Sequence, residues 1–159
     1  MPEFALPYVP QSLTTAFEHD DPNCHGKQHE RANLESLQRQ IAAIGAGDFA
    51  ALQAELDPDI HFEIHCPDMF PWIKHARGLQ GVLSAIGHNF SVLKDQSTRI
   101  LTVVAQGDLL NVTLAETGCL KECGTPYEVI GLQQFHFCGG KVVRLTEFLT
   151  SKSPMPAAE

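Results

Sequence analysis

The sequence predicts one α+β domain in which helices come first and an antiparallel sheet follows. Between residues 29 and 93 apolar residues mostly recur at three- and four-residue spacing, as on one face of a helix. Between residues 97 and 150 they alternate instead, as on one face of a strand, and short glycine-containing turns separate the alternating runs. Helical runs followed by strands joined through short turns favour an α+β domain with an antiparallel sheet. With 159 residues, 43% of them hydrophobic, the chain can bury one core.

The two ends of the chain are predicted to lie outside this domain. Residues 1–28 contain four prolines and no sustained period, which indicates an irregular arm. The apolar residues in this arm are too many for a freely solvated tail. Residues 151–159 are expected to fray. The domain itself is therefore placed at residues 29–150.

Three helices are predicted. The first carries an apolar stripe between Leu34 and Ile44 and is expected to end at Gly45 and Gly47. Asp48 is a suitable N-cap for a short second helix, which the run 57–59 interrupts. The third begins after Gly78, and its apolar stripe extends to residue 93.

Five strands are predicted. Residues 60–66 alternate and are closed by Pro67, after which a proline-bounded loop carries Phe70 and Trp72. The other four strands are expected at about 97–106, 109–120, 127–137 and 142–150. The turns between them carry glycines at 107, 124, 139 and 140.

Three of these strands have an apolar face that is interrupted once by a polar side chain. The interrupting residues are Glu116, Gln133 and Glu147. Such a face is either a core with satisfied polar members or the wall of a pocket for a mostly apolar ligand. A carboxyl group buried there has its pKa pushed upward, which suits a general acid.

The last turn decides whether Glu147 and Gln133 share a face. A two-residue loop at Gly139 and Gly140 would set Glu147 opposite Leu132, on the other side. A three-residue loop starting at Cys138 pairs Phe137 with Lys141 and sets Glu147 beside Gly131, on the Gln133 side. We expect the three-residue loop because it unites the two most amphipathic faces.

Composition excludes several classes of partner. A net charge of -8, with 11 basic residues against 19 acidic ones, argues against a nucleic-acid surface. Five cysteines, an odd number and widely spaced, indicate neither a disulfide framework nor a four-ligand zinc site, so we expect reduced thiols in a cytoplasmic protein. No stretch reads as a signal peptide or a membrane span, and no membrane partner is expected.

The order of several weak motifs resembles the nuclear transport factor two-like superfamily, in particular its SnoaL-like and ketosteroid isomerase-related branch. The motifs are the two helices around Gly47-Asp48, Asp59-Ile60, His65-Cys66-Pro67, Pro71-Trp72, Arg77-Gly78, and the four-strand meander with Gly107-Asp108 and Gly140-Lys141. They span about residues 29–150. The resemblance implies a cone-shaped, curved and mixed sheet roofed by three helices over a deep pocket. It also implies a homodimer through the outer sheet face, where Ile130, Leu132 and His136 are expected.

The resemblance also suggests residue roles. In ketosteroid isomerase the general base ends the first strand just before a proline, which matches His65 or Cys66 here, and His65 is the better chemical match. The oxyanion-hole acid of that enzyme corresponds to Gln133, whose amide can donate a hydrogen bond but lacks a tunable acidic proton. The scaffold is therefore carried over more securely than the steroid isomerisation itself.

His61, Glu63 and His65 lie two residues apart, so they share one face of the first strand. They form either a proton-transfer set, with Glu63 orienting His65, or a solvated face with Phe62 and Ile64 pointing into the core. A zinc site at these three residues is compatible with the spacing, but nothing else in the chain supports it. We expect neither a metal nor another cofactor.

The sequence thus predicts a small cofactor-independent acid-base enzyme of isomerase, cyclase or dehydratase type. Its ligand would be a small hydrophobic molecule, cyclic or polyketide-like. The alternative is a non-catalytic ligand-binding or dimerisation module of the same fold. The expected catalytic residues are His65, Glu63, Glu147, Gln133 and Glu116, and the expected ligand-contacting residues are Trp72, Phe70, His61, Phe135, Leu114 and Leu145.

Overall fold

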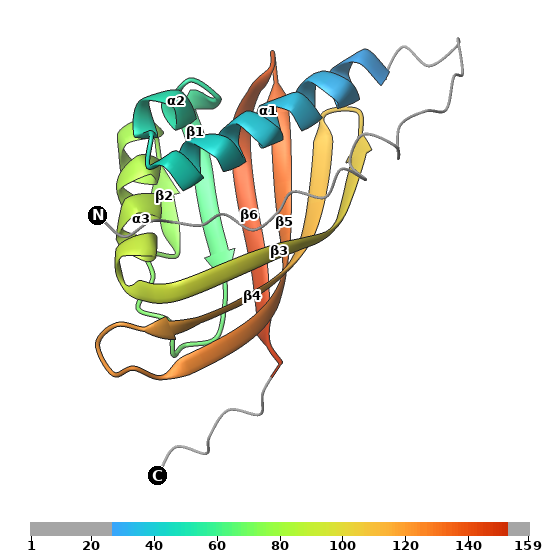
Figure 1. The fold of residues 1–159 in the computed structure, drawn as a ribbon. Coiled ribbons are helices and arrows are strands. Elements are labelled where there is room, and N and C mark those ends of the chain that lie inside the picture. Colours follow the sequence, from blue (N-terminus) through green and yellow to red (C-terminus); the bar gives the residue numbers. More distant parts are fainter. Residues whose placement is uncertain (1–26, 153–159) are drawn as a thin grey trace.

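A computed structural model describes residues 27–152 and has an α+β fold, with three helices packed on one face of a curved six-stranded sheet (Figure 1). The sheet order is β2-β1-β6-β5-β4-β3. The helices are α1 (Lys27–Ala46), α2 (Phe49–Gln53) and α3 (Leu79–Ser91). The strands are β1 (Leu56–His65), β2 (His75–Arg77), β3 (Leu93–Gln106), β4 (Leu109–Leu120), β5 (Pro126–Cys138) and β6 (Lys141–Ser151).

The sheet is mixed, as expected. β1 runs parallel to β6, and every other neighbouring pair is antiparallel. The long strands β3 and β4 bend strongly where they pass beneath α3, so the sheet forms a hollow on the side of the helices (Figure 1). This curvature keeps the sheet from packing flat against α1 and leaves the space that the pocket occupies.

The first two helices follow the sequence signals closely. α1 runs through Gly45 and ends at Ala46, and Gly47 follows with a φ of 66°, the left-handed conformation that commonly ends a helix. Asp48 caps α2 as predicted, because its Oδ1 accepts a hydrogen bond from the Ala51 N–H at 2.9 Å.

Two strands differ from the prediction near the start of the sheet. β1 begins at Leu56, four residues earlier than expected, and residues 57–59 continue the strand where an interruption was predicted. Pro58 is tolerated because β2 pairs only with residues 61–63, so the earlier part of β1 has a free edge. β2 itself lies in the stretch predicted as loop, since three residues are too few to show a period.

The predicted register of the last hairpin is wrong, although the face of Glu147 is right. Gly139 and Gly140 have φ values of 56° and 78° and form a two-residue loop, with Cys138 opposite Lys141. Phe137 then pairs with Val142 but His136 pairs with Arg144, so the extra residue Val143 forms a bulge. This bulge shifts the rest of β6 by one residue, so that Glu147 lies opposite Gln133 and not Leu132, whereas the predicted partner was Gly131. The extra residue therefore lies inside the strand and not in the loop.

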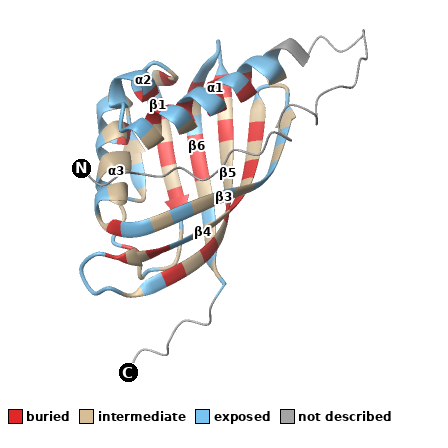
Figure 2. Cartoon of the chain, in the orientation of Figure 1, coloured by how far each residue is buried: buried red, intermediate tan, exposed pale blue. Residues whose placement is uncertain are grey.

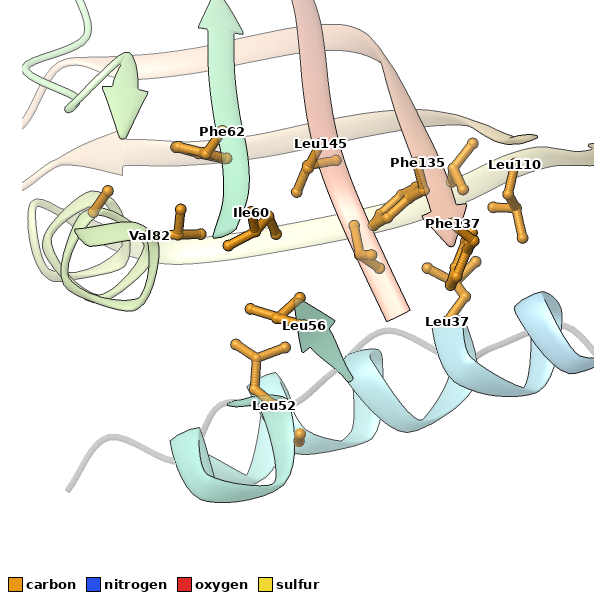
Figure 3. Packing of buried hydrophobic residues seen from close by; sticks show 14 of the residues in the cluster. Leu37, Leu52, Leu56, Ile60, Phe62, Val82, Leu110, Phe135, Phe137 and Leu145 are labelled. Atoms are coloured by element: carbon orange, nitrogen blue, oxygen red, sulfur yellow. The ribbon is translucent and has the colours of Figure 1, made fainter. Parts of the chain in front are cut away.

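The core lies between the helices and the concave face of the sheet, where buried residues alternate with others along β1, β4, β5 and β6 (Figure 2). Ile60, Phe62 and Leu145 point from neighbouring strands towards the helices (Figure 3). Leu37 of α1, Leu52 of α2 and other helical side chains face them from the opposite side (Figure 3). A second, smaller cluster gathers Phe70, Leu93, Leu120, Tyr127 and Val129 beneath the bent ends of β3 to β5.

The predicted arm at residues 1–28 lies outside the described residues except for its last two, which begin α1. Of the predicted tail, Ser151 ends β6, and residues 153–159 lie outside the described part of the chain. Within residues 27–152, no helix has the length and apolar character needed to cross a membrane.

Candidate functional site

The concave side of the sheet encloses a pocket made of two adjoining chambers. The larger chamber has a volume of about 380 Å³ and lies between α1, α2, α3 and the strands β3 to β5. The smaller chamber, of about 150 Å³, lies against β1 and β6. Both chambers are lined mostly by apolar side chains, and Leu114, Glu116 and Gln133 contribute to the walls of both. Each predicted polar interruption therefore faces the pocket, because Glu147 lines the smaller chamber.

Glu147 and Gln133 form a hydrogen-bonded pair in the wall of the smaller chamber. The bulge at Val143 sets the two residues opposite each other on β6 and β5, and Gln133 Nε2 donates to Glu147 Oε1 at 2.8 Å. Burial in this apolar wall raises the pKa of Glu147 to about 7, from its usual value of 4.5. The amide donor lowers this pKa and the charge of Glu116 raises it further, but both effects are smaller than that of burial.

Glu116 occupies a different environment in the same pocket. Tyr127 Oη donates to Glu116 Oε1 at 2.7 Å, and Thr98 Oγ1 donates to Glu116 Oε2 at 2.9 Å. The Tyr127 pKa is raised, first by burial and then by the nearby carboxylate, so the phenol stays protonated and remains a donor. The pocket thus holds one carboxylate anchored by donors and one carboxyl group that titrates near neutrality.

Gly118 makes room for the tyrosine. It pairs with Tyr127 across β4 and β5, and a Cβ atom at this glycine would lie 2.7 Å from the Tyr127 hydroxyl oxygen and 2.9 Å from two ring carbons. No real Cβ makes such contacts, so only glycine lets the ring lie across the strand and reach Glu116.

The predicted ligand-contacting residues mostly line the smaller chamber. Trp72, Phe135, Leu114 and Leu145 are part of its wall. Phe70 is not in the wall of either chamber; it is buried, stacks on Trp72 at 4.2 Å and meets Tyr127 edge-on at 5.1 Å. It supports the wall from behind and does not face a ligand.

His65, Glu63 and His61 lie on the outer face of the sheet, away from the pocket, which corrects their expected place beside a ligand. Ile60, Phe62 and Ile64 of the same strand are buried on the pocket side. His65 Nε2 contacts Glu63 Oε1 at 3.0 Å, and their side chains are 51% and 38% exposed. The His65 ring stacks on Phe148 at 4.9 Å, also outside the pocket.

The physical reason for this placement is the free energy gained by burying Ile60, Phe62 and Ile64, which point to the opposite face of β1. Burying three large apolar side chains is worth several kcal/mol, because each contributes about 1.5–3 kcal/mol on leaving water. Turning the strand over would expose these side chains and bury two imidazoles and a carboxylate instead. The motif position alone therefore could not place His65 in the pocket.

Sequence reasoning missed several polar residues that line the pocket or bond to a residue in its wall. Tyr127 lies on the same face of β5 as Gln133, and its alternation with Val129 could have identified it. Thr98 of β3 gave no signal, because threonine is common on either face of a strand. The amides Asn89 and Gln96 also line the smaller chamber, and they come from two separate elements.

No group of three or more His, Cys, Asp or Glu side chains among the described residues is arranged to hold a metal ion. This finding covers His61, Glu63 and His65, for which zinc was an alternative. The four cysteines between residues 27 and 152 are free thiols.

Comparison with known proteins adds a family match. A family model described as a SnoaL-like domain matches residues 37–145. A nuclear transport factor two-like (NTF2-like) protein from Burkholderia xenovorans has a similar structure, with a TM-score of 0.67, 22% identity, and coverage of 76% of this chain and 91% of that one. No curated protein matches the sequence at a significant level.

Two further similar structures bear functional names. One is a provisionally named isomerase from Bacillus subtilis, with a TM-score of 0.61 and 19% identity, covering 76% of this chain and 87% of that one. The other is a provisionally named SnoaL-like polyketide cyclase from Jannaschia sp. CCS1, with a TM-score of 0.63 and 17% identity over the same shares of the two chains. At these identities the likeness establishes the fold alone.

Proposed function

This chain belongs to the SnoaL-like domain family, with the NTF2-like fold, and from that premise we propose that it is a small acid-base enzyme. It transfers a proton on an apolar molecule, cyclic or polyketide-like, that is bound between the helices and the concave face of the sheet. Isomerisation, cyclisation and dehydration are the reaction types that such a proton transfer serves. Similar structures named as an isomerase and a polyketide cyclase support this choice of class.

The observation that carries the proposal is the raised pKa of Glu147. Its pKa of about 7 means that both the acid and the carboxylate are well populated at neutral pH. A general acid or base works best when its pKa lies near the working pH. Gln133 holds one carboxyl oxygen, and no described residue donates a hydrogen bond to the other. Glu147 is therefore the group in this pocket that is equipped to move a proton.

The proton transfer runs as follows. The Glu147 carboxylate takes a proton from a carbon next to a ligand carbonyl; the C–H bond breaks and its electron pair moves to the oxygen as an enolate. The protonated Glu147 then returns the proton to a different atom of the ligand, which restores the carboxylate. No other reactant is consumed. Gln96, whose amide also lines this chamber, is suited to donate a hydrogen bond to the enolate oxygen.

Glu116 has a supporting part in this scheme. Both of its oxygens already accept hydrogen bonds from Tyr127 and Thr98, so they are less available to a ligand than the free oxygen of Glu147. Its negative charge raises the pKa of Glu147 and so keeps the acid form available. Gln133 orients the Glu147 carboxyl group through the hydrogen bond between them.

Hydrogen-deuterium exchange tests the proposal without knowledge of the natural substrate. A bicyclic ketone such as 2-tetralone is incubated with the protein in D₂O, and the loss of its α-hydrogens is followed by proton NMR. We expect the protein to accelerate this exchange, with a pH profile governed by a group near 7. Glu147→Gln should slow the exchange by at least about 100-fold, the smallest usual contribution of a general acid or base.

Glu63→Gln is the matched control, because it makes the same chemical change on the outer face. It should leave the exchange rate unchanged. Binding is followed separately through the fluorescence of Trp72, which is the single tryptophan of the chain and lines the smaller chamber. Ligand binding without any hydrogen-deuterium exchange would refute the proposed enzymatic function and favour the alternative, a non-catalytic binding module.

The outer face of the sheet is proposed to pair two copies of the chain. Ile130 and Leu132 are half-buried there, and Phe148 of the neighbouring strand is 45% exposed beside Leu132. Such an apolar area suits a two-fold interface. Light scattering should give a dimer that Phe148→Asp converts to a monomer, whereas Ile73→Asp, at an exposed position in the loop before β2, should not. A cytoplasmic location remains part of the same proposal.

A further inference from the structure

The charged side chains in the wall of the smaller chamber are all acidic. Glu116 and Glu147 both line the smaller chamber, and none of the residues that form its wall is a lysine, arginine or histidine. The larger chamber adds Asp48 and one cation, Lys121, and neither of them lines the smaller chamber. The donors on Glu116 are the hydroxyls of Tyr127 and Thr98, which are neutral and leave its negative charge unbalanced.

We propose that the ligand of this pocket carries a basic nitrogen on its apolar ring system, bound as an ammonium group at Glu147 and Glu116. The proposal rests on the function given above, because it takes the same chambers as the ligand site. It adds the charge of the ligand, which the family and the fold do not specify.

The physical reason is the cost of unpaired charge in an apolar wall. A carboxylate away from water and without a counter-ion is strongly disfavoured, and a ligand cation supplies that counter-ion. The oxygen of Glu147 that Gln133 does not hold has no hydrogen-bond partner among the described residues and is free to accept from an ammonium. A ligand carboxylate or phosphate would instead place a third negative charge in the same chamber.

The aromatic side chains of the smaller chamber favour the same ligand class. Trp72, Phe90 and Phe135 line it, and the faces of aromatic rings attract ammonium groups. These rings also bury the apolar part of the ligand. An ammonium at the two carboxylates keeps Glu147 ionised, and because each carboxylate oxygen has two acceptor sites, Glu147 can still accept the proton of the proposed reaction.

The pH dependence of binding separates an amine from a neutral ligand. An ammonium binds the ionised form of Glu147, so its affinity should rise as the pH rises through the neutral region. A ketone or alcohol that accepts a hydrogen bond from protonated Glu147 should bind less tightly over the same range. The groups that face Glu147 are Glu116, Gln133 and Cys66, and burial raises the pKa of the Cys66 thiol, which therefore stays neutral.

Three bicyclic ligands of matched shape test the proposal: 2-aminotetralin, 2-tetralol and tetralin-2-carboxylate. Binding is measured through Trp72 fluorescence at about pH 6 and about pH 8, and calorimetry in buffers of different ionisation enthalpy counts the protons released. At about pH 8 we expect the amine to bind at least about 10-fold more tightly than the alcohol. This is the gain in affinity that one charge-assisted hydrogen bond provides over a neutral one. The carboxylate should bind more weakly than either.

Variants show where the ammonium binds. Glu147→Gln should weaken the amine about 10-fold or more, change the alcohol little, and abolish proton release. Glu116→Gln should also weaken the amine, and it serves as the second variant if Glu147→Gln fails to fold. Glu63→Gln should change none of these values.

The outcomes separate this inference from the proposed function. If the alcohol binds in the pocket and the amine binds no more tightly, the inference is overturned and the acid-base function stands. If the carboxylate binds best, the inference is overturned as well. If none of the three ligands changes Trp72 fluorescence or gives heat of binding, both the inference and the proposed function are overturned.

Discussion

Replacing Glu147 by glutamine should make the protein more stable at alkaline pH. The folded protein holds this carboxyl group with a pKa of about 7, whereas in the unfolded chain the pKa returns to about 4.5. Between these two values the folded state binds one proton more than the unfolded state, so the free energy of unfolding falls as the pH rises. Stability from this group is complete below about pH 4.5 and is lost by the time the pH has passed about 7.

The size of the effect follows from the difference between the two pKa values. About two and a half pH units at 1.36 kcal/mol each give about 3 kcal/mol between acidic and alkaline conditions. Glutamine has nearly the same shape as a protonated glutamic acid and can keep the hydrogen bond with Gln133, but it does not titrate. The variant should therefore match the wild type at about pH 4.5 and exceed it by up to about 3 kcal/mol at about pH 8.

Urea unfolding curves of both proteins at several pH values measure this difference directly. Subtracting the two proteins removes the contribution of every other titrating group. Glu63→Gln, the same change on the outer face, should give no such pH-dependent gain. An equal stability difference at all pH values would refute the raised pKa, and with it the central argument of the proposed function.

Three further substitutions test other parts of the structure. Gly118→Ala should push the Tyr127 ring off Glu116 and lower stability by about 1–3 kcal/mol, as for other overpacked sites, and melting curves would record this. Glu55→Gln should cost about 1–3 kcal/mol at neutral pH, because Ser36 and Arg39 donate to the carboxylate of Glu55 and lower its pKa. Since that pKa is lowered, the contribution of Glu55 is present above about pH 4.5 and fades as the pH falls below it. His65→Ala should leave ligand affinity and proton exchange unchanged, because His65 lies outside the pocket.

Matched variants calibrate the first two of these predictions. Gly81→Ala is the control for Gly118→Ala, because a Cβ at this exposed helical position meets no atom within 4 Å. It should be neutral or slightly stabilising. Glu35→Gln is the control for Glu55→Gln, since Glu35 pairs with Arg31 on the exposed face of α1 and should contribute little. Equal losses from Gly118→Ala and Gly81→Ala, or from the two glutamate variants, would contradict the assigned roles.

Much of the fold could be predicted from local sequence. The bounds of β4 agree with the prediction, and those of β5 and β6 differ from it by one residue at each end. These strands could be found because a clear apolar alternation runs between glycine turns. The cap at Asp48 was equally predictable, since capping depends only on neighbouring residues. β2 was missed because its pairing with β1, and not its three residues, makes it a strand.

The candidate site was predicted in part. Glu116, Gln133 and Glu147 face the pocket as expected, because each belongs to an apolar face that had to turn inward. His65 was misplaced because its position in the family motif was weighed against the apolar face of Ile60, Phe62 and Ile64, and it is this apolar face that is buried. Thr98 and Gln96 of β3 could not be found, since the bend of the sheet brings them to the pocket from a strand without a clear period.

By itself the sequence determined the α+β class, the turns, and which residues share a face, because these properties depend on side chains only a few positions apart. Tertiary structure decided the bulge at Val143 that sets Glu147 against Gln133, and the burial that raises the pKa of Glu147 to about 7. Desolvation and strand register both arise from segments far apart in the chain, and for this reason they could be seen only once those segments were packed together.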